Sequence, residues 1–406
     1  MTLNKQNNNT GPIAHQSLSV QLALTGHSFL ITHTHTKEVL FFCETIFEQA
    51  TTPEELLTHL TQKINDTSAL KQNFDHVMVH TGQNFTPELK DFFFKDLKIR
   101  KPDYNLNIST ASYGKEVADV IHKSDQLFEK IKPDALVVLG DTYSALSVMP
   151  AANKKIKIFH MEAGLRAWDK RMPEQRNRIL IDHMSDILLP FNKYHRENLI
   201  RENIHPSKIF VTGNTTFEVM REFKEQINAS EILKKLNLDK KSYLLVTAHR
   251  SENVDDPKNL ELIFKALNNI QKKLKLKIIY PMHPRTFQKK KNLAEKYKID
   301  VIKPLGFYDF NKLLMNSCCI LSDSGTAAEE GIFYSIPSVS LRMTTERPET
   351  VESGGNIISG MDVINITDSI ETAMMNIGNT KYDLENEYLP SSVVINAIRS
   401  NITNFF

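Results

Sequence analysis

Two short apolar runs in the middle of the chain constrain its fold more than any other feature. Residues 135–139 stop at a Gly-Asp-Thr turn that contains Asp141, and residues 156–159 lead directly toward Glu162. Uninterrupted apolar runs of this length, bounded by turn residues, are typical of buried parallel strands. Both acids therefore fall at the carboxyl ends of strands, which form the edge where open α/β sheets bind ligands.

A third acid follows in the same stretch. Pro173 fits the first turn of a helix, and Glu174 then lies beside the positive end of that helix. Three carboxylates at one crevice, with arginines around them, suit proton transfer on a bound, negatively charged substrate. The alternative for any single acid is structural: Asp141 caps a helix, or Glu162 pairs with an arginine. The nearby arginines are Arg166, Arg176 and Arg178.

The composition argues against several other classes of protein. Lys and Arg number 50 and Asp and Glu 48, and the resulting net charge of +2 does not suit an extended nucleic-acid surface. The three cysteines form no Cys-x-x-Cys pair, which argues against a zinc ribbon and fits a reducing cytoplasm. No stretch is long and apolar enough to span a bilayer. We therefore expect a cytoplasmic protein with no metal, membrane or nucleic-acid partner.

The first 74 residues have a pattern of their own. Residues 1–10 are polar and rich in asparagine, and they are expected to be a disordered lead-in. Residues 17–31 alternate apolar and polar positions and residues 39–42 are apolar again, which predicts an antiparallel hairpin or meander. Residues 52–64 have the start signal and the apolar face of a helix.

From residue 75 onward, strand, turn and helix alternate, which predicts an α/β fold with a parallel sheet covered on both faces. The expected strands are 76–80, 135–139, 156–159, 187–190, 209–212, 243–247, 277–280, 301–302, 320–321 and 337–341, and helices include 117–131 and 193–202. A charged stretch at 228–241 separates two domains in a chain of 406 residues. The predicted divisions are 1–74, 75–228, 229–385 and a C-terminal helix within 386–406.

The second half carries its own polar residues at strand ends. His249 and Arg250 follow the strand 243–247, and a histidine in such a place is as often structural as catalytic. Residues 322–331 begin Ser-Asp-Ser-Gly-Thr, so small residues precede a helix whose free N–H groups suit a phosphate. Glu330, a turn into that helix, is placed to accept ribose hydroxyls. This signal alone is weak, since many turns from strand to helix have a similar sequence.

Two further residues are candidates for nucleotide contacts. Arg347 precedes a proline and is able to hold a pyrophosphate through paired hydrogen bonds. Phe310 belongs either to the core or to a surface that stacks on a base. The chain has no Walker motif, no Gly-x-Gly-x-x-Gly turn and no internal repeat.

Taken together and in order, these motifs resemble those of the non-hydrolysing UDP-N-acetylglucosamine 2-epimerase family. The resemblance runs from about residue 75 to the C-terminus, and the ordered set is highly specific although each motif alone is not. The motifs are Gly140-Asp141-Thr142, His160-Met161-Glu162-Ala163-Gly164-Leu165-Arg166, Pro173-Glu174 with Asn177-Arg178, Gly213-Asn214-Thr215, His249-Arg250 with Glu252-Asn253, Asp323-Ser324-Gly325 with Glu329-Glu330, and Thr344-Thr345-Glu346-Arg347-Pro348-Glu349.

The resemblance implies two Rossmann-like domains in the glycosyltransferase-B arrangement, a UDP-sugar in the cleft between them, a C-terminal helix that packs back on the first domain, and a homodimer. It implies that the C2 proton is removed and UDP is expelled from C1, leaving a bound 2-acetamidoglucal. UDP adds back after C2 is protonated from the other face, and no cofactor takes part. Because C2–H is a weak acid, a fixed base and a supported leaving group must act together.

The same resemblance gives the residues their roles. Asp141, Glu162 and Glu174 are similar to the proton-handling acids, and His249 to the residue beside the diphosphate that assists departure and return of UDP. The implied substrate contacts are Arg166, Arg250, Phe310 on the uracil side, Ser324, Gly325 and Thr326 in the phosphate turn, Glu330 at the ribose, and Arg347.

The sequence departs from the family pattern at several positions. Thr326 stands where a third glycine is usual, Ala328 where a glutamine is usual, and Gln175 where a second glutamate is usual. Residues 80–84 with 101–104 look more like the branch that acts on modified sugars in capsule or O-antigen synthesis. The implied substrate is therefore UDP-N-acetylglucosamine or, as the alternative, a modified UDP-2-acetamido sugar.

The largest departure is at the start. The family opens with a central strand ending in Gly-Thr-Arg-Pro-Glu, whose arginine meets the UDP phosphates, and no such motif occurs before residue 75. Either residues 17–31 replace this strand, or the first domain lacks it, as a rearranged or fused gene product would. The alternatives to an epimerase are a hydrolysing relative, a glycosyltransferase on the same fold, and a UDP-sugar-binding relative impaired in catalysis.

Overall fold

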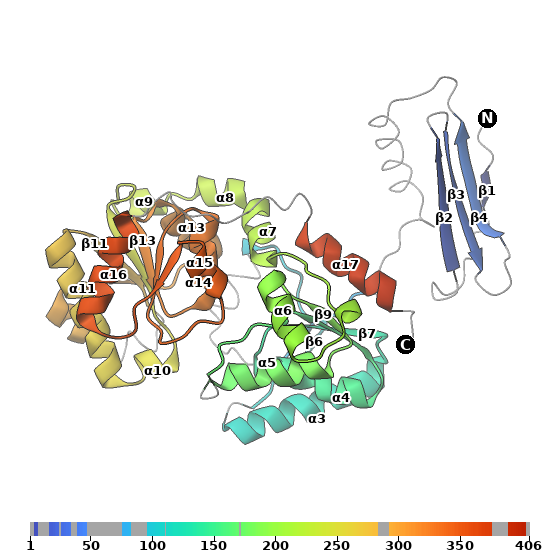
Figure 1. Ribbon diagram of the computed structural model, residues 1–406, viewed down its shortest axis with the longest axis horizontal. Coiled ribbons are helices and arrows are strands. Elements are labelled where there is room, and N and C mark those ends of the chain that lie inside the picture. Colours follow the sequence, from blue (N-terminus) through green and yellow to red (C-terminus); the bar gives the residue numbers. More distant parts are fainter. Residues whose placement is uncertain are drawn as a thin grey trace. The chain divides into compact units, whose positions relative to one another are not determined.

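The computed structural model divides into two compact units, residues 1–77 and 78–406. Figure 1 colours them by position along the chain. The residues that the structure describes are 4–6, 16–23, 26–33, 39–46, 75–82, 96–109, 111–169, 172–282, 292–375 and 389–402. The helix predicted at 52–64 lies outside them. Each unit is described by itself.

The first unit is a four-stranded antiparallel sheet in the order β1-β4-β3-β2. The predicted meander is confirmed, since β2 pairs with β3 and β3 with β4, both antiparallel. The expected disordered lead-in is wrong for Asn4–Gln6, because these residues pair with β4 through backbone hydrogen bonds that need no apolar side chains. The other strands are β2 (Gln16–Ala23), β3 (Gly26–His33) and β4 (Val39–Ile46).

The first half of the second unit contains two small parallel sheets, β5-β6 and β7-β8-β9. The strand predicted at 209–212 is reduced to one bridge between Ile209 and Leu188. The strands are β5 (Val79–His80), β6 (Tyr104–Asn105), β7 (Ala135–Leu139), β8 (Lys157–Met161) and β9 (Ile187–Leu189). The helices are α3 (Tyr113–Ile131), η3 (Tyr143–Ser147), α4 (Val148–Asn153), α5 (Pro173–Met184), α6 (Lys193–Arg201), η4 (Pro206–Lys208) and α7 (Thr215–Glu222).

Helix α3 illustrates how local sequence builds this half. It begins after Ser112, whose hydroxyl accepts a hydrogen bond from a first-turn N–H, and it ends at Lys132 in the left-handed region. Its apolar stripe includes Val120, which packs in one buried cluster with Val138 of β7. Figure 1 shows α3 and α4 on one side of the β7-β8-β9 sheet and α17 (Pro390–Asn401) on the other.

Helix α17 covers the second face of this sheet. Val394 and Ala397 are buried in a cluster with Phe159 of β8. The N–H and the hydroxyl of Ser391 both donate to the Glu218 carboxylate of α7, at 2.8 and 2.5 Å. The end of the described chain therefore stabilises the half from which the strand-end acids come.

The sheet of this half is open: its strand β7 lacks a neighbour on one side among the described strands, whereas the central strands of a doubly wound sheet have neighbours on both sides. In the part of the chain that the structure describes, β7 bonds only to β8, and β5 only to β6. Val137 and Leu139 on one face of β7 are 44% and 56% exposed, and Val77 and Val79 at β5 are also exposed. Residues 17–31, the candidate replacement strand, pair with each other as parts of β2 and β3.

The second half is a complete six-stranded parallel sheet in the order β12-β11-β10-β13-β14-β15. The first five strands in chain order confirm predicted strands, whereas β15 was missed because a three-residue strand after two glycines has no readable pattern. The strands are β10 (Tyr243–Thr247), β11 (Lys277–Pro281), β12 (Asp300–Ile302), β13 (Cys319–Ser322), β14 (Ser338–Ser340) and β15 (Asn356–Ile358).

Helices cover both faces of this larger sheet (Figure 1). Ile263 of α11 and Ile370 of α16 share one buried cluster, and Leu313 of α13 and Ala327 of α14 share another on the opposite face. No helix among the described residues is long and apolar enough to cross a membrane. The helices are α8 (Lys224–Ala229), α9 (Ile232–Lys235), α10 (Ser251–Val254), α11 (Pro257–Leu274), α13 (Phe307–Asn316), α14 (Gly325–Phe333), α15 (Pro348–Glu352) and α16 (Val363–Met375).

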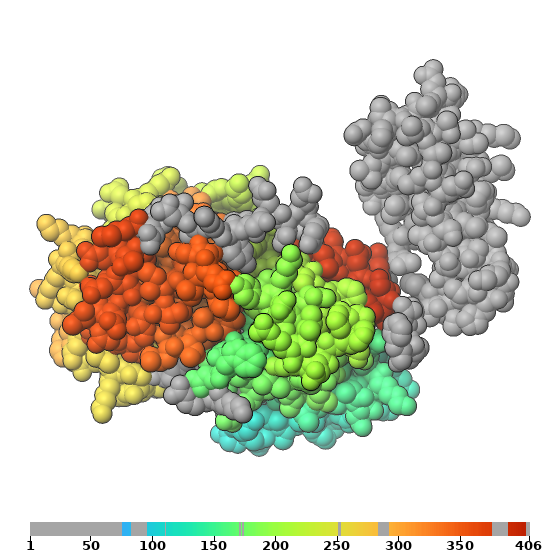
Figure 2. Space-filling view, in the orientation of Figure 1, coloured from blue at the N-terminus to red at the C-terminus, as the bar shows by residue number. Residues whose placement is uncertain are grey.

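The two halves of the second unit are in direct contact. Asn192 Nδ2 donates to Glu349 Oε1 at 3.0 Å, and the Tyr194 hydroxyl donates to the Glu352 carboxylate. Figure 2 shows the green surface of the first half lying against the orange surface of the second. Residues from both halves are therefore able to contribute to one site.

Candidate active site

Asp141 follows β7 at a turn whose geometry requires Gly140. Gly140 has a φ of +70°, and a Cβ there would lie 3.0 Å from Glu162 Oε2. The Asp141 carboxylate pairs with Arg178, and its backbone carbonyl accepts a hydrogen bond from Asn177 Nδ2 at 2.9 Å. Both partners belong to α5, so this helix fixes Asp141 through its side chain and its backbone.

Glu162 follows β8 in a backbone conformation that is uncommon for a residue with a side chain. Its φ is 66°, and its N–H donates to the Leu189 carbonyl at 3.1 Å. Such strained residues persist where the surrounding structure fixes them, and they cluster at functional sites. Glu162 Oε1 accepts a hydrogen bond from Arg347 Nη2 at 2.6 Å. Because Arg347 belongs to the second half, this bond joins the two halves at the site.

Glu174 occupies the first turn of α5, where the proline before it was expected to start a helix. Its carboxylate has no hydrogen bond or ion pair among the residues that the structure describes. Burial raises the pKa of Tyr143 in η3, and the negative charge of Glu174 contributes to that increase. Glu174 therefore lies near η3, the turn that follows Asp141.

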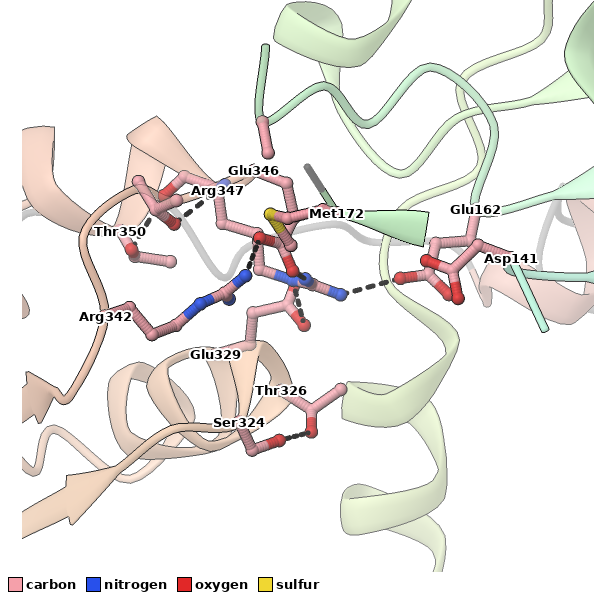
Figure 3. A network of polar contacts seen from close by, with 12 residues as sticks. Asp141, Glu162, Met172, Ser324, Thr326, Glu329, Arg342, Glu346, Arg347 and Thr350 are labelled. Atoms are coloured by element: carbon pink, nitrogen blue, oxygen red, sulfur yellow. Dashed lines mark hydrogen bonds and ion pairs between the residues drawn. The ribbon is translucent and has the colours of Figure 1, made fainter. Parts of the chain in front are cut away.

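Arg347 is the centre of a buried ion network in the second half (Figure 3). Besides Glu162, its guanidinium forms ion pairs with Glu346 at 2.7 Å and Glu329 at 3.0 Å. Glu346 also forms an ion pair with Arg342 Nη2 at 2.6 Å, and Arg178 of the first half lies 3.7 Å from Glu346. Figure 3 shows the Arg347 side chain extending toward Glu162 and Asp141.

Burial and these charges shift two carboxyl groups in opposite directions. Burial alone would raise the pKa of Glu346, but Arg347, Arg342 and Arg178 outweigh it and hold that pKa well below 4.5. At Glu329, burial outweighs the attraction of Arg347 and raises the pKa from 4.5 to about 7. Glu346 is therefore a fixed negative charge, whereas Glu329 exchanges its proton near neutral pH.

The turn before α14 (Gly325–Phe333) lies against this network, because Gly325 approaches Arg347 and Glu346 closely. Ser324 Oγ and Thr326 Oγ1 lie 2.8 Å apart. Gly325 is required between them, because a Cβ there would meet the Arg347 guanidinium and would lie 2.8 Å from Glu346 Oε1. A helix start next to an arginine suits an anion such as a phosphate.

A buried aspartate holds the turn that carries His249 and Arg250. Asp323 accepts the His249 N–H at 3.1 and 3.0 Å, the Arg250 N–H at 3.0 Å and Asn253 Nδ2 at 3.0 Å. The His249 ring remains 60% exposed, with Nδ1 3.6 Å from Asp323 Oδ1. The backbone of this turn is thus fixed while the ring stays accessible. The role of Asp323 was not predicted from the sequence, although its position directly after a strand is the same signal that marks Asp141.

Three of the predicted substrate contacts, Arg166, Phe310 and Glu330, are enclosed to different degrees by other parts of the protein. The Arg166 guanidinium bonds Glu202 at 2.7 and 2.6 Å and Asp182 at 2.7 Å, and it is completely buried. This enclosure places Arg166 among the supports of the site rather than in its lining. Phe310 is half-buried against the cluster beneath β10 and β13. Burial and then the charge of Glu329 raise the pKa of Glu330 to about 8.

Comparison with known proteins relates the two units to different families. The family model described as UDP-N-acetylglucosamine 2-epimerase matches residues 68–391. A second family model, described only as a protein of unknown function, matches residues 5–87. The start of the first match agrees with the predicted start of the resemblance near residue 75.

Several individual proteins resemble the chain over most of their length. A UDP-N-acetylglucosamine 2-epimerase of Methanococcus maripaludis is 37% identical over 72% of this chain and 83% of its own. The UDP-2,3-diacetamido-2,3-dideoxy-D-glucuronate 2-epimerase of Pseudomonas aeruginosa is 35% identical over 77% and 87%. The crystal structure of Methanocaldococcus jannaschii UDP-GlcNAc 2-epimerase in complex with UDP-GlcNAc and UDP is 33% identical, covers 85% of this chain and 96% of that one, and has a TM-score of 0.76.

Fold and site together define a two-domain α/β protein of the glycosyltransferase-B arrangement, in which residues of two Rossmann-like domains meet at one site. This is the fold class that the sequence predicts. The chain belongs to the UDP-N-acetylglucosamine 2-epimerase family.

Proposed function

We propose that the protein interconverts UDP-N-acetylglucosamine and UDP-N-acetylmannosamine by inverting C2 of the sugar. A carboxylate removes the C2 proton, the electrons of the C2–H bond form a C1–C2 double bond, and UDP leaves with the electrons of the C1–O bond. UDP then adds back to C1 as C2 of the bound 2-acetamidoglucal receives a proton on the opposite face. The observation that carries this proposal is the 2.6 Å bond between Glu162 and Arg347, one residue from each domain.

Arg347 provides a means to couple substrate binding to proton transfer. A diphosphate is a stronger bidentate partner for a guanidinium than one carboxylate oxygen, so it competes with Glu162 for Arg347. The same interaction stabilises the negative charge that develops on the leaving UDP. Binding therefore releases the Glu162 carboxylate toward C2 and supports departure of UDP in one rearrangement.

We assign the remaining residues to roles around this bond. Asp141, Glu162 and Glu174 remove and return the proton on the two faces of the sugar, and the exposed ring of His249 assists the diphosphate as UDP leaves and returns. Arg166 supports the site from behind. The substrate contacts are Arg250, Ser324, Gly325, Thr326 and Arg347 at the diphosphate, Glu330 at the ribose and Phe310 on the uracil side.

Proton NMR of the purified protein with UDP-N-acetylglucosamine in heavy water tests the proposal. We expect loss of the C2 proton signal together with growth of the UDP-N-acetylmannosamine signals. Release of free N-acetylmannosamine would instead identify a hydrolysing relative. Binding of UDP by a folded protein without any C2 exchange would contradict the proposed reaction.

A modified UDP-2-acetamido sugar is the second candidate substrate. It is favoured by the similarity to the Pseudomonas aeruginosa enzyme, which is named for a diacetamido uronate and is 35% identical. Parallel assays with UDP-N-acetylglucosamine and the diacetamido uronate nucleotide distinguish the two candidates. A kcat/KM at least tenfold higher for the uronate would favour the second candidate.

The proposal extends to assembly and compartment. We infer that the protein is a homodimer and that it acts in the cytoplasm. Soluble nucleotide sugars are available in that compartment, and thiols remain reduced there. The buried Cys318 and Cys319 are compatible with this setting, since burial raises the pKa of both thiols. Light scattering of the purified protein should give twice the chain mass of 46.5 kDa.

A further inference from the structure

Behind the strand-end acids lies a pair of buried residues that the proposed reaction does not use. His160 of β8 and Asp182 of α5 are 0% and 1% exposed. Asp182 Oδ1 lies 2.7 Å from His160 Nδ1. Asp182 Oδ2 lies 2.7 Å from Arg166 Nη2 and accepts the Gly164 N–H at 3.1 Å. Every oxygen of this carboxylate is thus occupied by a donor.

The partners of His160 determine its protonation. Its Nε2 lies 3.0 Å from the Gly140 carbonyl, which is only able to accept a hydrogen bond. Its Nδ1 faces Asp182, whose pKa burial alone would raise but which His160 and Arg166 lower. With an acceptor at each ring nitrogen, both nitrogens are placed to donate a hydrogen bond, which is the arrangement that an imidazolium satisfies. The charge of Arg166 is in turn balanced by Glu202.

This pair connects the two turns that carry Asp141 and Glu162. His160 bonds the carbonyl immediately before Asp141, and Asp182 bonds the N–H two residues after Glu162. Asp182 lies on α5, the helix whose first turn carries Glu174. Helix α5 therefore carries Glu174 directly and is connected, through the His160–Asp182 pair, to the two turns that carry Asp141 and Glu162.

We propose that His160 and Asp182 are positioning residues, an imidazolium–carboxylate pair that sets the spacing of Asp141 and Glu162 for proton transfer at C2. This inference rests on the proposed function. A displacement of about 1 Å in a reacting group costs on the order of 100-fold in rate. Loss of the pair is expected to act on kcat, because the diphosphate contacts lie in the other domain.

Asp186 offers a matched control for Asp182. Its Oδ2 accepts the Ile158 N–H at 2.8 Å, so it also holds β8 through a charge-assisted bond to the backbone. That bond lies at the amino end of β8, away from the acids. Asp182→Asn and Asp186→Asn therefore remove the same charge, and each changes a carboxylate that accepts a backbone N–H: that of Gly164 beyond the carboxyl end of β8 and that of Ile158 at its amino end.

Steady-state kinetics and melting temperature of both variants test the proposal. We expect Asp182→Asn to lower kcat for epimerisation about 100-fold with KM changed less than about threefold. Asp186→Asn should lower the melting temperature but keep kcat within about twofold. Equal losses of kcat in the two variants, or an unchanged kcat in Asp182→Asn, would overturn the positioning role.

Histidine ring ¹⁵N NMR separates this inference from the proposed function. With the His160 signal assigned from His160→Gln, we expect both ring nitrogens of the wild type to be protonated between about pH 6 and pH 8. In Asp182→Asn the ring should become neutral. A neutral His160 in the wild type overturns the pair even in an active enzyme. A wild type with the imidazolium but no C2 exchange overturns the proposed function instead.

Discussion

The two domains of the second unit differ in how far their sheets are closed. In the second domain, β10 and β13 each have neighbours on both sides, and Leu245 and Leu321 are fully buried. In the first domain, β7 bonds to β8 alone among the described strands, and Leu139 is 56% exposed. The network around Arg347 thus lies at the edge of a complete sheet, whereas Asp141 and Glu162 follow strands of a sheet that is open among the described residues.

This difference coincides with the two family matches. The family model described as UDP-N-acetylglucosamine 2-epimerase begins at residue 68, and the model described as a protein of unknown function covers residues 5–87. An open strand edge leaves backbone N–H and C=O groups to water. Under the proposed assignment, nucleotide binding therefore depends on the complete sheet and C2 chemistry on the open one, and variants in each domain test the two separately.

The largest expected effect is on catalysis and comes from substitutions in the first domain, whose sheet is open. Asp141→Asn and Glu162→Gln should each lower C2 exchange by about 100- to 10,000-fold, because a carboxylate that handles the proton is lost. Ser324→Ala, in the complete domain, should raise KM about fivefold with kcat nearly unchanged, since it removes one phosphate contact. Proton exchange in heavy water and initial rates measure both. Full exchange in both acid variants would show that the acid assignment is wrong.

The next effect concerns stability. Leu321→Ala leaves a cavity in the complete sheet and should lower the free energy of unfolding by about 2–5 kcal/mol. Leu139→Ala removes an exposed side chain at the open edge and should cost less than about 0.5 kcal/mol. Urea denaturation of the two variants measures the difference. Similar losses would mean that the β7 edge is covered in solution, and the comparison between the domains would then fail.

Much of this arrangement could be predicted from the sequence. The run at 243–247 became β10, which is buried on both faces as an uninterrupted apolar run predicts. The run at 135–139 became β7, but the expected burial is wrong for one face, where Val137 and Leu139 are exposed. The acids after such runs could be placed at the sheet edge by the same argument. The order of the motifs then gave the family, which no single residue could have given.

Other features had no local signal. β15 is stabilised by its pairing with β14. Residues 209–212 have the apolar side chains that favour a strand, but they form only a single bridge, at Ile209. The enclosure of Arg166 depends on Asp182 and Glu202, which are distant in sequence and approach only when α5 and α6 pack. The raised pKa of Glu329 likewise follows from burial, which a motif does not report.

A smaller effect is expected from pH on the stability of the second domain, whose sheet is complete. The pKa of Glu329 rises from 4.5 to about 7 on folding, so the folded state binds this proton more tightly. Its contribution to stability is therefore present below about pH 4.5 and is lost as the pH rises to about 7. Glu329→Gln should flatten this part of the stability profile, measured by urea denaturation from pH 5 to pH 8. The exposed Glu225→Gln is the control, and identical profiles for wild type and Glu329→Gln would contradict the prediction.

The smallest effects should be equal in the two domains. Lys154 bonds Asp125 and Glu129 on the surface of the first domain, and Lys273 bonds Asp368 and Glu371 on the surface of the second. Exposed ion pairs contribute little, because water and salt screen them. Lys154→Met and Lys273→Met should therefore each shift the melting temperature by less than about 2 °C. A clearly larger shift for Lys154→Met would mean that the open domain depends on its surface charges, and the contrast between the domains would then extend beyond their sheets.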